Sequence, residues 1–185
     1  MREPLSYGAH FNVAPSHGIS RNESMKKFLE WFRENKKTRR LEIIGREHCG
    51  KTWFAKKISE MSECVSSHFC RPDEPQSSEP ATVIRSIGEQ LMRQFPNLVL
   101  PRLSTVTLLE DTVSALDHFL RFPLETMPSS SKPVFIVIDC VEDEETQILI
   151  QMLIDILPTW IRMVTTSRQE NSVGKKEKKK AIYWN

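Results

Sequence analysis

An eight-residue stretch, GREHCGKT, has the residue types and the spacing of a loop that wraps phosphate groups. Its two glycines allow the backbone to turn tightly enough for successive N–H groups to point inward. A helix that starts directly after such a loop adds the positive end of its dipole. The stretch therefore predicts a binding loop for a nucleoside triphosphate, formed by Gly45, Arg46, Glu47, His48, Cys49, Gly50, Lys51 and Thr52.

Two side chains at the end of this loop have chemical roles of their own. Lys51 would place its charge on the β- and γ-phosphates, and the Thr52 hydroxyl would be a ligand to Mg²⁺. The alternative is an accidental glycine-rich turn. The context favours the phosphate site, because a short apolar segment precedes the loop and an amphipathic segment follows it.

A second acidic position is needed to hold the cation from the opposite side. Asp139 follows five apolar residues, Val134 to Ile138, which is the pattern of a strand buried on both faces. Ligands of open α/β sheets bind at the carboxyl edge of the strands, so Asp139 is expected opposite Thr52, holding Mg²⁺ through water. A helix cap is the alternative for Asp139 alone, and the presence of GREHCGKT upstream favours the metal site.

Three further residues are candidates for catalysis. Glu142 and Asp143 follow Asp139 closely, and either carboxylate could orient a water molecule for attack on the γ-phosphate. Arg168 ends a polar run, Thr165 to Arg168, and could sense the γ-phosphate. The alternatives are acids that merely favour a helix start and a solvated surface arginine.

The elements that must position these residues alternate along the chain. Apolar runs predict strands at residues 41–44, 64–70, 134–138 and 161–166. Apolar residues at helical spacing predict helices at residues 25–32, 54–61, 80–95, 109–120 and 145–157, the last of them buried nearly all round. Strands that alternate with helices predict an α/β fold with a mostly parallel sheet covered on both faces. The basic cluster at Lys36 to Arg40 is expected to be a solvated loop.

The composition excludes several classes of protein. The chain is 39% hydrophobic and 27% charged, which is an ordinary globular balance. A formal net charge of only +2 makes nucleic acid an unexpected partner. No run approaches the roughly 18 apolar residues of a membrane span. Four cysteines without a CxxC pair fit a reduced, cytoplasmic protein, and the lysine-rich segment 175–180 leaves nuclear targeting as an alternative.

With these motifs in place, the chain resembles the NACHT-type signal-transduction NTPases of the STAND class, particularly members attached to ankyrin or similar repeats in animals. The motifs run in family order from about Ser20 to Glu170: GREHCGKT with WFAKKI, SSHFCRPDE, VFIVIDCVEDEE and RMVTTSRQE. The resemblance implies a three-layer P-loop core with ASCE-type strand order, in which the strand at Ile161 lies between the P-loop strand and the Val134 strand. It makes Asp139 the Walker B aspartate, Glu142 and Asp143 the acidic pair, and Arg168 a sensor-like residue.

The chain departs from the family pattern at three places. Cys140 stands where a small residue, often glycine, is common, and the acidic pair is Glu-Asp where Asp-Glu is more usual. After Arg168 the family continues with a fifth strand, helical and winged-helix parts, whereas this chain runs NSVGKKEKKKAIYWN. We therefore expect a truncated form with the C-terminal part of the sheet missing, the Leu41 strand near a sheet edge, and AIYW too short to cover it.

These observations predict a domain plan and a function. Residues 1–19 would be an irregular arm, 20–170 the NTPase domain and 171–185 a basic, disordered tail. The resemblance implies Mg²⁺-dependent binding of ATP or GTP as a signalling switch, with slow hydrolysis, with protein partners, and with self-association left open. One alternative is a non-hydrolysing interaction or scaffold fragment of a larger repeat-containing protein. Another is a small-molecule kinase, although no arginine-rich lid follows the core.

Overall fold

The computed structural model describes most of the chain. The described residues are 9–10, 21–34, 38–98, 111–127, 129–139, 141, 144–168 and 182–184. Among them, no helix is long and apolar enough to cross a membrane.

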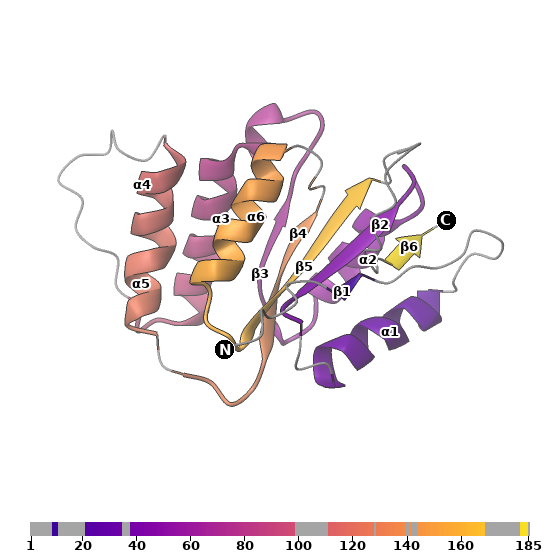
Figure 1. The fold of residues 1–185 in the computed structure, drawn as a ribbon, viewed down its shortest axis with the longest axis horizontal. Helices are drawn as coiled ribbons and strands as arrows, with labels where there is room; N and C mark the ends of the chain where they lie inside the picture. The colour runs from indigo at the N-terminus through magenta and orange to yellow at the C-terminus, as the bar shows by residue number, and fades with distance from the viewer. Residues whose placement is uncertain are drawn as a thin grey trace, which may run out of the picture.

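Four parallel strands form the centre of one sheet (Figure 1). Their spatial order is β2 (Arg40–Gly45), β5 (Ile161–Arg168), β4 (Val134–Asp139) and β3 (Cys64–Phe69). Strand β5 pairs with β2 on one side and with β4 on the other, so the implied position of the Ile161 strand is confirmed. The chain has the α/β fold and the strand order predicted for a P-loop NTPase core.

Helices cover both faces of this sheet, which makes three layers (Figure 1). One face carries α1 (Arg21–Glu34) and α2 (Lys51–Ser59). The other face carries α3 (Pro80–Gln94), α4 (Thr112–Leu116), α5 (Phe122–Glu125) and α6 (Glu144–Ile156), with a 3₁₀ turn at Pro75–Ser78 before α3. Helix α3 starts with Pro80 at its first turn, where the missing N–H costs nothing.

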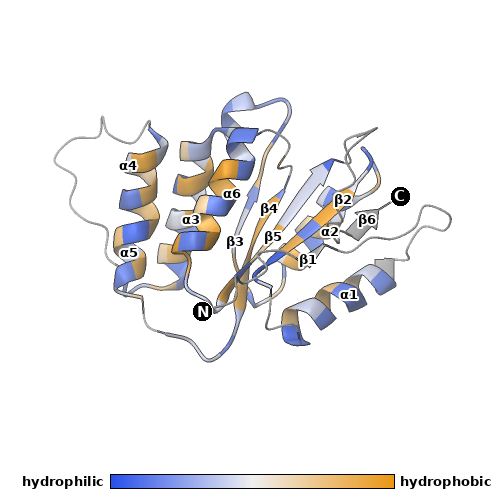
Figure 2. Cartoon of the chain, in the orientation of Figure 1, coloured by the Kyte–Doolittle hydropathy of each residue, from blue (hydrophilic) through white to orange (hydrophobic). Residues whose placement is uncertain are grey.

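Strand β4 separates two hydrophobic cores. Phe135 and Val137 pack on the α1–α2 side, whereas Ile136 and Ile138 pack on the α3–α6 side. Successive side chains of a strand point to opposite faces, so a strand covered on both faces must be apolar at every position. The apolar colour of β4 in Figure 2 follows from this double burial.

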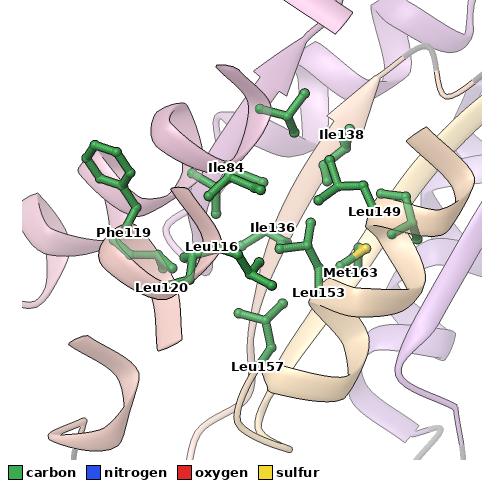
Figure 3. Packing of buried hydrophobic residues seen from close by; sticks show 14 of the residues in the cluster. Ile84, Leu116, Phe119, Leu120, Ile136, Ile138, Leu149, Leu153, Leu157 and Met163 are labelled. Carbon is green, nitrogen blue, oxygen red and sulfur yellow. The ribbon is translucent and has the colours of Figure 1, made fainter. Parts of the chain in front are cut away.

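The two cores are built from different side chains. The larger core is aliphatic, and Figure 3 shows Ile84, Leu116, Ile136, Leu153 and Met163 meeting between the helices and the sheet. The smaller core is aromatic: Phe28 and Phe32 stack with centroids 6.0 Å apart and each meets the edge of Phe135.

Arg162 ties β5 to this aromatic core. Its guanidinium donates to the carbonyl of Trp31 at 2.8 Å and lies over the rings of Trp31 and Phe32. Burial of the guanidinium lowers the pKa of Arg162, and the aromatic faces and the carbonyl compensate part of the lost hydration. Helix α1, which lies outside the minimal strand–loop–helix unit, is thereby held against the sheet.

Strand β2 lies next to the edge of the sheet, as predicted for the Leu41 strand, but its outer side is covered by two short strands, which corrects the prediction that AIYW is too short to cover it. Strand β1 (Ala9–His10) pairs with Leu41 and Glu42, and β6 (Ile182–Trp184) pairs with residues 43–45 of the same strand. The sequence AIYW is short, but three residues suffice because two short strands share one edge. Residues 182–184 are thus a strand within the segment expected to be disordered, and the rest of that segment lies outside the described residues.

Arg39 and Arg40, the described arginines of the basic cluster before β2, bond other elements of the fold. This corrects the prediction that the cluster is a solvated loop. Arg39 donates to the carbonyls of Ile154, Leu157 and Pro158 at 2.5–3.1 Å. The last carbonyls of a helix lack partners within the helix, so a cation here satisfies the end of α6. Arg40 bonds Thr165 and Gln147 and forms an ion pair with the buried Glu42. Lys36 and Lys37 lie outside the described residues.

Two predicted helices differ in detail from the structure. Helix α6 buries one face only, since Ile148 is 56% exposed and Gln151 and Asp155 also face outward. The helix expected at 109–120 is described from Thr112 and changes to a π-helical turn at Asp117–Arg121. Pro123 has no N–H to donate to Phe119, and Phe122 instead bonds the carbonyl of Asp117, five residues back.

Candidate functional site

The loop after β2 has two residues in the left-handed conformation, His48 with φ 58° and Gly50 with φ 96°. Glycine adopts this conformation without strain, whereas a histidine rarely does. Gly50 is also the residue that precedes the first turn of α2, and it has no side chain to bond the N–H groups there. The start of α2 therefore keeps donors and a positive dipole end for an anion.

Lys51 folds back over its own loop. Its ammonium donates to the carbonyls of Gly45 at 2.8 Å and Arg46 at 2.6 Å. The Cys49 sulfur lies 3.9 Å from the same nitrogen. These bonds hold the charge at the centre of the loop, where phosphate oxygens would meet it.

Asp139 lies between two threonine hydroxyls. Thr52 donates to one carboxylate oxygen at 2.8 Å, and Thr166 donates to the other at 2.5 Å. Asp139 is only 2% exposed, so these two bonds determine where its buried carboxylate points. The loop, β4 and β5 thus meet at one point, as parallel strands with a common carboxyl edge require.

The Thr52–Asp139 pair fits a magnesium ion. Mg²⁺ prefers oxygen ligands and is usually held by one or two carboxylates together with substrate phosphates and water. Thr52 gives its proton to Asp139, so the lone pairs of its hydroxyl oxygen stay available to a cation. Thr52 itself is exposed at the mouth of the loop.

Arg168 is the last residue of β5 and forms an ion pair with Glu47 of the loop, at 3.4 Å. The register of the sheet explains the pairing, since Gly45 and Arg168 lie opposite each other across β2 and β5. Arg168 therefore lies at the same sheet edge as Lys51 and Asp139.

A cavity of about 520 Å³ joins these groups. Its lining comes from the loop, α2, the segment after β3, and the ends of β4 and β5; the polar and charged members are Glu47, His48, Lys51, Thr52, Lys56, Arg71, Asp73, Asp139, Thr166 and Arg168. Gly50 and three apolar or sulfur-bearing residues, Phe69, Cys70 and Pro72, complete it. A volume of this size suits a ligand of nucleotide or small-molecule dimensions.

The sequence-predicted residues divide into three groups. The structure brings Glu47, His48, Gly50, Lys51, Thr52, Asp139 and Arg168 to the cavity. Gly45, Arg46 and Cys49 belong to the loop without lining the cavity, although Gly45 and Arg46 hold Lys51. Glu142, Asp143 and Cys140 lie outside the described residues.

Lys56, Arg71 and Asp73 line the cavity but were missed as candidates. Arg71 and Asp73 follow β3, whose carboxyl end lies at the same edge as that of β4. The polar sequence RPDE after a predicted strand was the available signal. Thr166 was noted only as part of a polar run, and its bond to Asp139 depends on strand order.

By residue type, Cys64, His68 and Cys70 could in principle hold a metal ion, but among the described residues no group of three His, Cys, Asp or Glu is arranged to do so. The Cys64 thiol donates to the carbonyl of Ser66, and burial raises the pKa of Cys64 to about 11. His68 bonds the carbonyl of Ser77.

Residues 23–168 match the family model described as Nephrocystin 3, N-terminal. The chain belongs to this family. The matched region begins inside α1 and ends on the last residue of β5, so it includes Lys51, Asp139 and Arg168.

A comparison with curated proteins gives no match for this chain. Among solved structures, it is similar to the crystal structure of Cdc6p from Pyrobaculum aerophilum, with 16% sequence identity and a TM-score of 0.45. That match covers 92% of this chain and 48% of the other, so the chain spans about half the length of Cdc6p.

Proposed function

We propose that this domain binds a nucleoside triphosphate together with Mg²⁺ and works as a switch of the NACHT type within the STAND class of NTPases. The observation that carries the proposal is the 2.8 Å contact between Thr52 at the end of the phosphate loop and Asp139 at the end of β4. These residues are 87 positions apart, and both line the cavity with Lys51, which supports a P-loop arrangement of the site.

Each side chain of the site then has a stated task. The N–H groups at the start of α2 and the Lys51 ammonium bind phosphate oxygens, and Lys51 gives up carbonyl bonds that a charged acceptor can replace. Thr52 and Asp139 would hold Mg²⁺, which neutralises phosphate charge when it is bound. Arg168 is placed to contact the terminal phosphate once it leaves Glu47.

Hydrolysis is the finer part of the proposal. We assign Glu142 and Asp143 to orient the attacking water, on the sequence pattern and the NACHT resemblance. Turnover is expected to be slow, as suits a switch whose state depends on which nucleotide is bound. The rate of phosphate release is compared between the wild type and a Glu142→Gln/Asp143→Asn variant. A slow NTPase should lose this activity in the variant, whereas a non-hydrolysing interaction module should release no phosphate in either form.

The binding test is a titration of the purified chain with fluorescent ATP and GTP in the presence of Mg²⁺. Lys51→Ala should weaken binding by roughly 30-fold or more, since a charge-assisted contact to phosphate is lost. Lys57→Ala is the matched control: Lys57 is on the same helix, is half exposed and pairs with Glu60 away from the cavity.

Equal affinity in Lys51→Ala and wild type would refute the assignment of the phosphate loop. A wild-type chain that unfolds cooperatively on heating, yet binds neither nucleotide, would refute nucleotide binding altogether. The thermal unfolding midpoint of each variant serves as the check that the fold is intact.

A further inference from the structure

Glu47 is an unusual residue for its position, because it places a carboxylate inside a loop proposed to hold phosphates. It forms an ion pair with Arg168 at 3.4 Å, and its carboxylate also lies 3.9 Å from the His48 ring. Asp139, a second carboxylate in the lining of the cavity, accepts hydrogen bonds from two threonine hydroxyls. Glu47 therefore supplies an anionic partner of Arg168 from within the loop itself.

Stability does not explain this pair. The side chains of Arg168 and Glu47 are 45% and 57% exposed, and ion pairs with that exposure contribute little to folding. A weak pair is easily exchanged for a stronger one, and a phosphate carries more charge and more acceptor oxygens than a carboxylate. The contact is thus suited to be broken by a ligand.

The charge balance of the cavity supports the same conclusion. Among the described residues, its lining has four cationic side chains (Lys51, Lys56, Arg71 and Arg168) and three acidic ones (Glu47, Asp73 and Asp139). Over these residues the formal excess is one positive charge with Glu47 charged and two without it. The Glu47 carboxylate therefore opposes the binding of an anion to the cationic side chains around it.

We propose that Glu47 is an internal competitor for the nucleotide: its carboxylate takes the place of the terminal phosphate on Arg168 and must be displaced when a triphosphate binds. This inference rests on the proposed nucleotide binding and assigns Glu47 a positioning function that acts through Arg168. The competition lowers the affinity for triphosphate and ties the position of Arg168 to the presence of the terminal phosphate. A diphosphate, which lacks that phosphate, leaves the Glu47–Arg168 pair in place.

The experiment is a double-mutant cycle on the full chain with Mg²⁺–ATP. Glu47→Gln should tighten binding about three- to tenfold at low salt, by removing repulsion and by releasing Arg168. The gain should be smaller in an Arg168→Ala background, where only the repulsion remains to be removed. The gain in affinity should also be smaller for Mg²⁺–ADP, which lacks the terminal phosphate. It should decrease at about 0.5 M salt, because salt screens the interactions between exposed charges.

Matched control variants separate the local effects of Glu47 and Arg168 from the effect of changing the net charge of the protein. Glu60→Gln removes an equally exposed carboxylate outside the cavity, and Arg93→Ala removes an exposed arginine that pairs with Glu89. Both should leave affinity within about twofold of the wild type, because neither charge contacts the site.

Three results would overturn the competition. Glu47→Gln affinity equal to or weaker than wild type would do so, as would an equal gain for ATP and ADP. A gain as large or larger in the Arg168→Ala background would show simple repulsion instead. The Lys51→Ala variant, measured in parallel, tests nucleotide binding separately from the competition. If Lys51→Ala loses binding while the Glu47 results contradict the competition, the proposed nucleotide binding is retained and only the competition is refuted.

Discussion

At the scale of single residues, the proposed magnesium ligand Asp139 has a buried carboxylate that two hydroxyl groups orient. Thr52 and Thr166 each donate to one of its oxygens, which prevents rotation of the carboxylate without neutralising its charge. Partners that orient a ligand group in this way typically influence metal affinity by 10–100-fold.

The first prediction is at this scale. Asp139→Asn keeps the shape of the side chain but removes its charge and replaces one acceptor oxygen with an NH2 donor. The threonine hydroxyl on that side can rotate and accept instead of donating, so the fold should persist. We expect the Mg²⁺-dependent part of nucleotide binding to fall by about tenfold or more, while binding with EDTA changes little. Nucleotide titrations with and without Mg²⁺ measure both quantities.

A conservative variant gives the control. Thr166→Ser keeps the hydroxyl that donates to Asp139 and should bind nearly as wild type does. If Asp139→Asn reduced binding equally with and without Mg²⁺, Asp139 would have a structural rather than a cation-related role.

At the scale of elements, α3 and the π-helical turn at Asp117–Arg121 approach each other closely at Gly88. A Cβ added at Gly88 would lie 2.5 Å from the carbonyl oxygen of Phe119 and 2.7 Å from its Cβ. Both contacts involve atoms that are fixed by the backbone, so they cannot be relieved by rotating a side chain. Gly88 is therefore needed for the helices to approach, although glycine weakens a helix by roughly 0.5–1 kcal/mol.

The second prediction concerns this contact. Gly88→Ala should lower the free energy of unfolding by about 1–3 kcal/mol, because overpacking outweighs the gain in helix propensity. Urea denaturation measures the change. Glu89→Ala, at an exposed neighbouring position, should change stability by no more than about 0.5 kcal/mol. A more stable Gly88→Ala variant would mean that the two helices separate at no cost.

At the scale of the whole molecule, two buried histidines make stability depend on pH. His68 is 8% exposed and His118 is 7% exposed, and burial lowers the pKa of both. A bond to the carbonyl of Ser77 offsets part of this effect at His68. The Nδ1 atom of His118 has no hydrogen-bond partner among the described residues, so a proton there would be buried without compensation.

The third prediction follows from the sign of these shifts. An unfolded histidine titrates near about 6.5, above the folded pKa, so the unfolded state binds more protons as the pH falls. The stabilising effect of the two neutral histidines is complete above about pH 6.5 and is lost as the pH falls below it toward the folded pKa values. Unfolding free energy from urea titrations should therefore decrease between pH 7.5 and 5.5, by on the order of 1 kcal/mol.

The slope with pH is the quantity to compare among variants. His68→Gln keeps a donor for Ser77 and, combined with His118→Gln, should flatten the slope. His48→Gln, at a 92% exposed side chain, should leave it unchanged. An unaltered slope in the double variant would assign the pH dependence to other groups.

The sequence alone determined the features that depend on neighbours along the chain. The loop from Gly45 to Thr52, the doubly buried strand that ends at Asp139, and the alternation of strands and helices all rest on local spacing, which depends little on the rest of the fold. Strand order came from resemblance to a family rather than from periodicity.

Tertiary structure decided the contacts between residues far apart in sequence. Arg39 binds the end of α6 across 115–119 positions, and Arg40 reaches Thr165 across 125. Strand β6 covers the edge of β2, and Arg168 meets Glu47. A basic cluster or a short apolar run can occur in a solvated loop, at a helix end or in a strand. The strand order and register of the folded sheet decide which of these it forms. The physical reason is that burial and pairing are properties of the assembled layers, whereas motif spacing is a property of the chain.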